Sequence, residues 1–305
     1  MTTDRLPAQR LGDAACSVAA RARHDPLVGS APPARGWLVF EHPGPWPRTA
    51  TAVFGRLGQQ MADRCLAVEV RPMLVRRPGR ATGTSPRRWW FVDSLARTSV
   101  TGTWESDDDV AAVLDLVDVR RLDAAARMVP AEPMILVCTH AKHDVCCAVR
   151  GRPIAATLST RWPESVWEAS HLGGDRFAGN VTMLPDSTFY GRLEPATAEH
   201  VVADHLAGVT TLEHYRGAGV HTPAEQAAVA EVLRRSGSPR HDDISVAGAQ
   251  PIGRDVWEVV LVGRGEVPAH TVVTVRRHWR EPHLLTCSGL QLKRAAEFEA
   301  QVVAV

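Results

Sequence analysis

The 305-residue sequence is poor in cysteine, in net charge and in long apolar runs. Six cysteines are too few for a disulfide scaffold in a chain of this length, and clustered cysteines in a reducing compartment are more often metal ligands or redox groups. The formal net charge of +1 supplies no global field to draw the protein onto nucleic acid or an anionic membrane, so we expect neither as a partner. The first ten residues lack a signal-peptide pattern, and the sequence has no bilayer-spanning run, which predicts a cytoplasmic location.

What is present is an ordinary globular composition, with 45% hydrophobic and 23% charged residues. A chain this long exceeds the size at which one core usually keeps growing, so two or three modules are expected. The order of apolar runs and turn residues predicts an α/β protein. We place an N-terminal α/β module at residues 1–125, a central domain at 126–212 and a C-terminal α+β module at 213–305.

The apolar patterns predict the following elements outside the centre. In the N-terminal module we expect helices at 12–23 and 50–64, strands at 37–40, 66–73, 87–92 and 98–104, and one or two helices within 110–117. In the C-terminal module we expect a helix at 223–235, capped by Thr222 and Pro223, and strands at 244–248, 256–263 and 271–279. A strand-like run at 284–287 and a final helix or strand follow.

The central stretch holds three of the six cysteines. A strand at 134–138 delivers Cys138 to its end, and Cys146 and Cys147 open a helix predicted at 145–158. Strands at 166–170, 180–184 and 188–193 and a helix at 197–207 complete the domain. A strand end and a helix start therefore present thiols beside free backbone N–H groups.

His171 and Asp175, which lie further along the chain, extend this set of possible ligands. Soft sulfur, one imidazole and one carboxylate suit either an iron–sulfur cluster or zinc. Zinc sites more often use paired C-x2-C spacings, and a dithiol oxidoreductase would want C-x-x-C or a resolving cysteine beside its nucleophile. The spacing alone leaves three functions open: an iron–sulfur protein, a zinc-stabilised interaction protein, and a thiol-dependent oxidoreductase using Cys146 or Cys147.

Two motifs carry a resemblance to a known family. Cys138-Thr-His-x3-Asp144-x2-Cys147 and Ser170-His171-x-Gly-Gly-x-Arg-Phe-Ala-Gly-Asn180 resemble the sucrase/ferredoxin-like family, most specifically across about residues 133–210. The resemblance implies a thioredoxin-like ferredoxin domain with a [2Fe-2S] cluster held by two cysteines and two histidines. On this pattern Cys138 and Cys147 are the cysteine ligands and His171 is the first histidine. Position 175, where the pattern has a second histidine, is Asp.

The fourth ligand is therefore open between Asp175, Cys146 and Cys287. The spacing from His171 favours Asp175. We expect His140, His143 and Asp144 to tune the cluster through hydrogen bonds, and Arg176 and Asn180 to hold the loop.

The resemblance predicts an electron carrier rather than a self-sufficient enzyme, so no residue is assigned a catalytic role. Its partners would be an electron donor and an acceptor, both redox proteins. A loop with Arg76, Arg77 and Arg80 could dock an acidic partner, although a solvated loop is the simpler interpretation. The lone Cys16 and Cys65 are interpreted as small buried hydrophobes.

Overall fold

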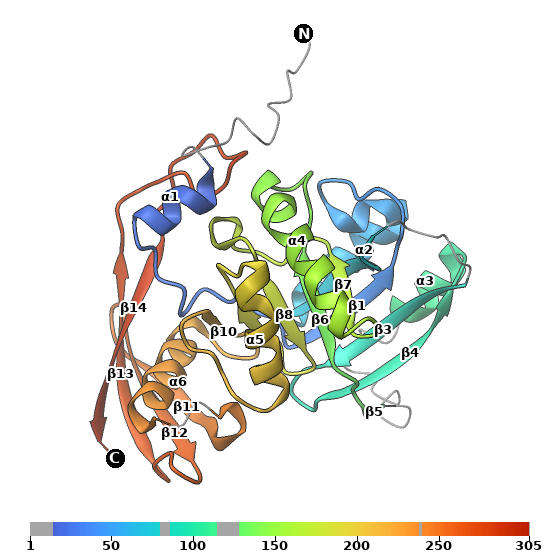
Figure 1. Cartoon of the computed structure of the whole chain (residues 1–305). Coiled ribbons are helices and arrows are strands. Elements are labelled where there is room, and N and C mark those ends of the chain that lie inside the picture. Colours follow the sequence, from blue (N-terminus) through green and yellow to red (C-terminus); the bar gives the residue numbers. More distant parts are fainter. Residues whose placement is uncertain (1–14, 80–85, 115–127, 238–239, 305) are drawn as a thin grey trace.

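The computed structural model describes residues 15–79, 86–114, 128–237 and 240–304. In this part the chain is a mixed α/β protein with a large ten-stranded sheet and a smaller four-stranded sheet (Figure 1). Arg80, the predicted helical residues beyond 114 and the predicted module boundary at 125–126 lie outside the described residues. No helix within these ranges is long and apolar enough to cross a membrane.

The N-terminal part supplies one half of the large sheet. Residues 12–14 of the first predicted helix lie outside the described residues. The other predicted elements are present, but the helix predicted at 50–64 opens as a 3-10 helix, and the strand predicted from Leu66 begins only at Val70 because the preceding helix continues to Ala67. The elements are α1 (Cys16–Ala22), β1 (Gly36–Glu41), the 3-10 helix η3 (Ala50–Phe54), α2 (Gly55–Ala67), β2 (Val70–Arg76), β3 (Arg87–Asp93), β4 (Thr98–Trp104) and α3 (Asp107–Leu114).

The central part supplies the other half and, through β5 (Val129–Pro130), the edge strand beside β4. Its predicted strands and helices are confirmed apart from the end of one strand, which stops at Tyr190 instead of residue 193. Two short strands, β5 and β10, are absent from the prediction. The elements are β5 (Val129–Pro130), β6 (Met134–Cys138), α4 (Val145–Arg161), β7 (Val166–Ala169), η6 (Asp175–Phe177), β8 (Val181–Leu184), β9 (Thr188–Tyr190), α5 (Pro195–Leu206) and β10 (Tyr215–Ala218).

The two halves form one continuous sheet with the order β10-β9-β8-β6-β7-β2-β1-β3-β4-β5. The junction is an antiparallel pairing of β2 with β7, in which Val75 lies opposite Ala169. Because β6 runs parallel to β7, the chain between them must cross over the sheet, and it does so through α4, which lies across the sheet face in Figure 1. On its other side, β6 pairs antiparallel with β8.

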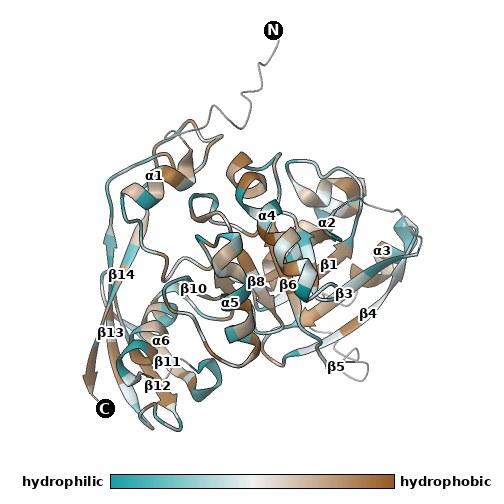
Figure 2. Ribbon diagram, viewed as in Figure 1, coloured by the Kyte–Doolittle hydropathy of each residue, from teal (hydrophilic) through white to brown (hydrophobic). Residues whose placement is uncertain are grey.

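Alternation along the strands builds a core on each face of this sheet. In β1, Trp37 and Val39 pack on one face, while Leu38 and Phe40 pack on the other. The face that holds Trp37 also holds Cys138 and residues of β2, β6 and β7, so both halves share one core. Figure 2 shows hydrophobic ribbon concentrated in the central strands beneath α4.

The C-terminal part is a helix packed on an antiparallel sheet, as predicted. Thr222 caps the helix, and alternate residues of β13 are buried against it, which leaves one wet face. The predicted strand-like run at 284–287 is not a strand and lies in the loop between β13 and β14. The elements are α6 (Pro223–Ser236), η7 (His241–Asp243), β11 (Ile244–Gly253), β12 (Val256–Gly263), β13 (Thr271–Trp279) and β14 (Ala296–Ala304).

Candidate metal centre

The centre begins where β6 ends and α4 starts. Asp144 caps the helix, because its carboxylate accepts a 2.9 Å hydrogen bond from the N–H of Cys146. One turn further on, Gly151 lies against the strand end: a Cβ atom there would come within 2.0 Å of the Cys138 carbonyl oxygen. The absence of a side chain thus lets the helix approach the strand closely enough to bring its first turn beside Cys138.

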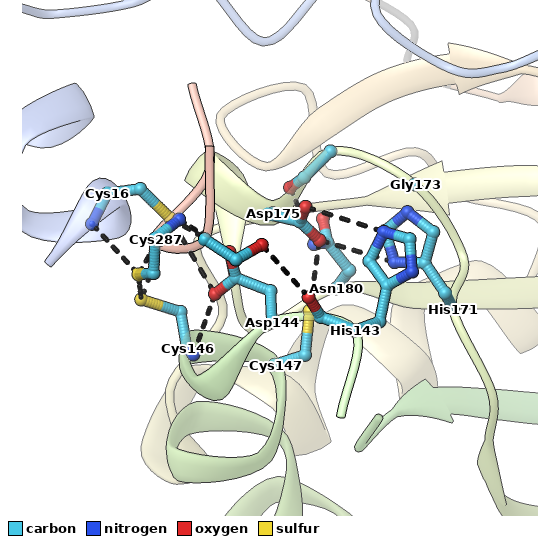
Figure 3. Close-up of polar contacts among 12 residues, drawn as sticks. Cys16, His143, Asp144, Cys146, Cys147, His171, Gly173, Asp175, Asn180 and Cys287 are labelled. Atoms are coloured by element: carbon cyan, nitrogen blue, oxygen red, sulfur yellow. Dashed lines mark hydrogen bonds and ion pairs between the residues drawn. The ribbon is translucent and has the colours of Figure 1, made fainter. Parts of the chain in front are cut away.

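Three predicted ligands converge at this point. The ligand atoms of Cys138, Cys147 and His171 all lie within 4.8 Å of one another, and both cysteines are buried. Asp175 joins them, with its Oδ1 atom 3.3 Å from the Cys147 sulfur and 3.2 Å from Nδ1 of His171 (Figure 3). These Cys and His side chains form a group that could bind a metal ion.

A buried arginine holds the loop that carries His171 and Asp175. The Arg216 guanidinium donates 2.9 Å hydrogen bonds to the Gly173 carbonyl and to the Asn180 side-chain oxygen, while the Asn180 amide donates to the Gly174 carbonyl. Gly173 and Gly174 have φ angles of 91° and 79°, a conformation that favours glycine. The loop therefore has a fixed shape.

Of the two residues predicted to hold this loop, Asn180 does so. Arg176 instead lies near Asp25, with its Nε atom 3.5 Å from a carboxylate oxygen, and covers the Phe177 ring. Arg216 was not predicted, because a lone arginine between two helices carries no local motif.

Burial and mutual contact shift the pKa values in the group. Burial raises the pKa of Asp175 to about 6, even though the neighbouring His171 opposes the shift. The pKa of the Cys138 thiol is lowered because the Cys147 thiol donates a hydrogen bond to it, and the pKa of Cys147 is raised by the same contact. The two thiols therefore favour a state in which they share one proton.

The other polar residues of the turn lie around this group. His143 stacks on His171 with ring centroids 3.5 Å apart, and burial lowers its pKa to about 4. His143 also belongs to a possible ligand set with His171 and Asp175. His140 Nε2 lies 2.8 Å from the Pro47 carbonyl oxygen. Of the three residues predicted to tune the cluster through hydrogen bonds, His143 contacts His171 by stacking, whereas His140 hydrogen-bonds to Pro47 and Asp144 accepts hydrogen bonds from the backbone of Cys146 and Cys287.

A pocket of about 620 Å³ opens beside the centre. His140, His143 and His171 line it together with Arg48 and Arg71. The His171 side chain is 24% exposed, so its imidazole can be reached from outside while the two cysteines are covered.

The other two candidates for the fourth ligand face a different place. Cys146 and Cys287 lie with their sulfurs 3.1 Å apart, and Cys16 joins them on the opposite side of Asp144 (Figure 3). Of the three candidates, Asp175 is the one in contact with Cys147 and His171. Cys16 is buried as expected, but its thiol contacts two other sulfurs, whereas Cys65 lies in an apolar core cluster.

The arginines of the supposed docking loop are engaged within the chain. Arg76 pairs with Glu168 at 2.8 Å, and Arg77 pairs with Glu164 at 3.2 Å while covering the Trp167 ring. Both guanidinium groups are therefore paired with carboxylates of the same chain.

Fold and centre together define an α/β protein with clustered cysteine and histidine side chains that could bind a metal. Residues 27–217 match the family model of the sucrase/ferredoxin-like proteins, and the chain belongs to that family.

Two curated relatives share part of the sequence, and both are named altered inheritance of mitochondria protein 32. The one from Meyerozyma guilliermondii is 31% identical over 97 residues, which is 28% of this chain and 34% of the relative. The one from Candida glabrata is 26% identical over 98 residues, which is 27% of this chain and 31% of the relative. The match thus spans about a third of each relative's length. No solved structure matches the chain.

Proposed function

We propose that the protein transfers single electrons through a [2Fe-2S] cluster bound by Cys138, Cys147, His171 and Asp175. The observation that carries this proposal is the convergence within 4.8 Å of two thiols and an imidazole that come from a strand end, a helix start and a later loop. Thiolate and imidazole are ligands of such clusters. The family to which the chain belongs agrees with this assignment.

The residues fit the group in two further respects. Nδ1 of His171 is buried and lies 3.2 Å from Oδ1 of Asp175, so these two proposed ligand atoms face the same point. The Cys138 thiol has a lowered pKa because the Cys147 thiol donates a hydrogen bond to it, and this favours the thiolate form that binds metal. The order β6-α4-β7-β8-β9-α5 supports a thioredoxin-like arrangement of this domain.

When bound, the cluster would supply a one-electron redox centre. The chain sets its properties through charge: thiolates and a carboxylate add negative charge and lower the potential, while the neutral imidazole of His171 raises it. The covered cysteines keep water from the sulfurs, and the pocket beside His171 lets that imidazole exchange a proton with solvent. We further propose that the protein acts in the cytoplasm, between a donor and an acceptor that are redox proteins.

Anaerobic purification tests the proposal. The protein should be brown and contain two iron and two sulfide ions per chain. Cys138→Ser and Cys147→Ser should each lose the visible spectrum, because a hydroxyl is a poor substitute for soft sulfur. Cys65→Ala is the matched control, since it removes a buried thiol from another core cluster.

Two results would overturn the proposal. A native visible spectrum in both serine variants would remove the assignment of the ligands. A colourless wild-type protein would refute the cluster: zinc at this site would then favour an interaction protein, and reactive thiols without metal would favour a thiol-dependent oxidoreductase.

A further inference from the structure

Three cysteines outside the proposed cluster meet at one point. Cys16 lies at the start of α1, Cys146 in the first turn of α4, and Cys287 in the loop between β13 and β14. Their sulfurs are 3.6 Å apart for Cys16 and Cys146, 3.1 Å for Cys146 and Cys287, and 3.4 Å for Cys287 and Cys16 (Figure 3). Segments as far as 271 residues apart in the sequence thus contribute one thiol each.

The surroundings of these sulfurs supply hydrogen-bond donors. The backbone N–H of Cys16 donates to the Cys287 sulfur at 3.3 Å, and the Ser17 hydroxyl donates to the Cys146 sulfur at 3.4 Å. Donors aimed at sulfur stabilise thiolates, which is the form that binds metal.

Asp144 completes the group. Its carboxylate accepts hydrogen bonds from the N–H groups of Cys146 at 2.9 Å and Cys287 at 2.7 Å, so it fixes both cysteine backbones. Its oxygens lie 3.8 and 3.9 Å from the Cys16 sulfur. The three soft sulfur ligands therefore have one hard oxygen ligand beside them, and the four side chains form a group that could bind a metal ion.

We propose that Cys16, Cys146 and Cys287 bind one Zn²⁺ ion as thiolates, with the Asp144 carboxylate as the fourth ligand. Zinc prefers four tetrahedral ligands, and a Zn–S bond of about 2.3 Å places neighbouring sulfurs about 3.8 Å apart. The observed separations of 3.6, 3.4 and 3.1 Å are shorter than this, by about 0.7 Å for the closest pair, so the sulfurs would move apart when the ion binds. Binding releases the thiol protons to solvent, and the ion balances charges that would otherwise repel at this spacing.

The presence of three thiols and a carboxylate favours zinc binding over oxidation of the thiols to a disulfide. A disulfide would join two of the three sulfurs and leave the third thiol and the carboxylate beside it without a role. A metal uses all four groups. The site would be structural, because four protein ligands close it, and it would tie α1 and the C-terminal loop to the start of α4. It shares no ligand with the proposed cluster and does not depend on it.

Metal analysis of the purified protein tests the site. We expect one zinc per chain in wild type, Cys138→Ser and Cys65→Ala, and a loss of at least tenfold in bound zinc in Cys16→Ser and Cys287→Ser. Iron should follow the opposite pattern and be lost in Cys138→Ser alone among these variants, so failure of one site is distinguishable from failure of the other.

Cobalt provides a readout that does not require the Cys16 or Cys287 variants to fold. In the Cys138→Ser protein, where cluster colour is removed, the metal is stripped with a chelator and Co²⁺ alone is added. Thiolate-to-cobalt charge-transfer bands and tetrahedral ligand-field bands are expected at one equivalent.

Three results would overturn the proposal: no zinc in the wild-type protein together with no thiolate bands from Co²⁺, undiminished zinc in both Cys16→Ser and Cys287→Ser, or a Cys146–Cys287 disulfide in protein purified under reducing conditions. Loss of iron in Cys16→Ser and Cys287→Ser, with no zinc anywhere, would move the cluster itself to this group and refute both assignments.

Discussion

Gly151→Ala is the sharpest test of how the fold holds the centre together. Gly151 is in the middle of α4, where its missing side chain faces the end of β6. An added Cβ atom would lie 2.0 Å from the carbonyl oxygen of Cys138 and 3.0 Å from its carbonyl carbon. Since such contacts below about 3 Å are not tolerated, the helix and the strand end must separate by about 1 Å or more.

That separation is large for a metal centre. Cys138 belongs to the strand and Cys147 to the helix, so the substitution moves the two thiols apart. Ligand positions need to be held within about 0.5 Å, and a shift of twice that should remove most of the cluster. Overpacking costs about 1–3 kcal/mol, of which the better helix propensity of alanine recovers up to about 1 kcal/mol. The chain should therefore fold but bind little iron.

The measurements are iron and sulfide per chain, the visible spectrum, and the urea midpoint of the purified variant. Gly248→Ala is the matched control, because no atom lies within 4 Å of a Cβ at that position. Full cluster occupancy with an unchanged spectrum in Gly151→Ala would refute the idea that close contact of α4 with β6 sets the ligand spacing.

Three further predictions concern single side chains. Asp175→His should raise the midpoint potential and steepen its pH dependence, since a neutral imidazole replaces a carboxylate; an unchanged potential in protein-film voltammetry would contradict ligation by Asp175. Arg216→Met should lower cluster retention during chelator challenge by roughly 10–100-fold, because it releases the Gly173 carbonyl, and equal retention would show that the loop holds its shape without it. Burial opposes ionisation of Asp186, but its contact with His205 lowers the pKa of Asp186 to about 2. The ionised carboxylate therefore stabilises the fold above the pKa of the unfolded state, and this stabilisation is lost as the pH falls towards 2. Asp186→Asn should therefore cost about 2 kcal/mol at pH 7 and roughly half of that at pH 3 in urea unfolding, and equal costs at the two pH values would refute this.

The sequence predicted those parts of the fold whose signal is local. Apolar runs bounded by turn residues gave β1, β3, β4, β6, β8 and β12 nearly to the residue, and the Thr222 cap located α6. The prediction began β2 too early because Leu66 continues an apolar pattern, although the structure leaves it exposed at the end of α2. The strands β5 (Val129–Pro130) and β10 (Tyr215–Ala218) were not predicted because neither contains an apolar run like the one that marks β8.

The candidate site shows the same contrast between residues with a local sequence signal and residues without one. The strand end and helix start that bring Cys138 near Cys146 and Cys147 are visible in the sequence, whereas the choice of Cys138, Cys147 and His171 as ligands rests on the family resemblance. The pairing of β2 with β7 and the meeting of Cys16 with Cys287 depend on contacts across about a hundred residues or more, for which a single sequence carries no local signal. Arg216 is invisible for the same reason.

The meeting of Cys16, Cys146 and Cys287 has a consequence for synthesis on the ribosome. At about 5–20 residues per second, Cys287 is made roughly 14–54 seconds after Cys16, from which it is 271 residues distant. The segment that carries Cys138, Cys147, His171 and Asp175 is complete well before that. The nascent chain can therefore form the ligand set of the central domain while Cys16 still has no Cys287 to meet. For that interval its thiol is open to oxidants and stray metal ions, and the final hundred residues end this exposure.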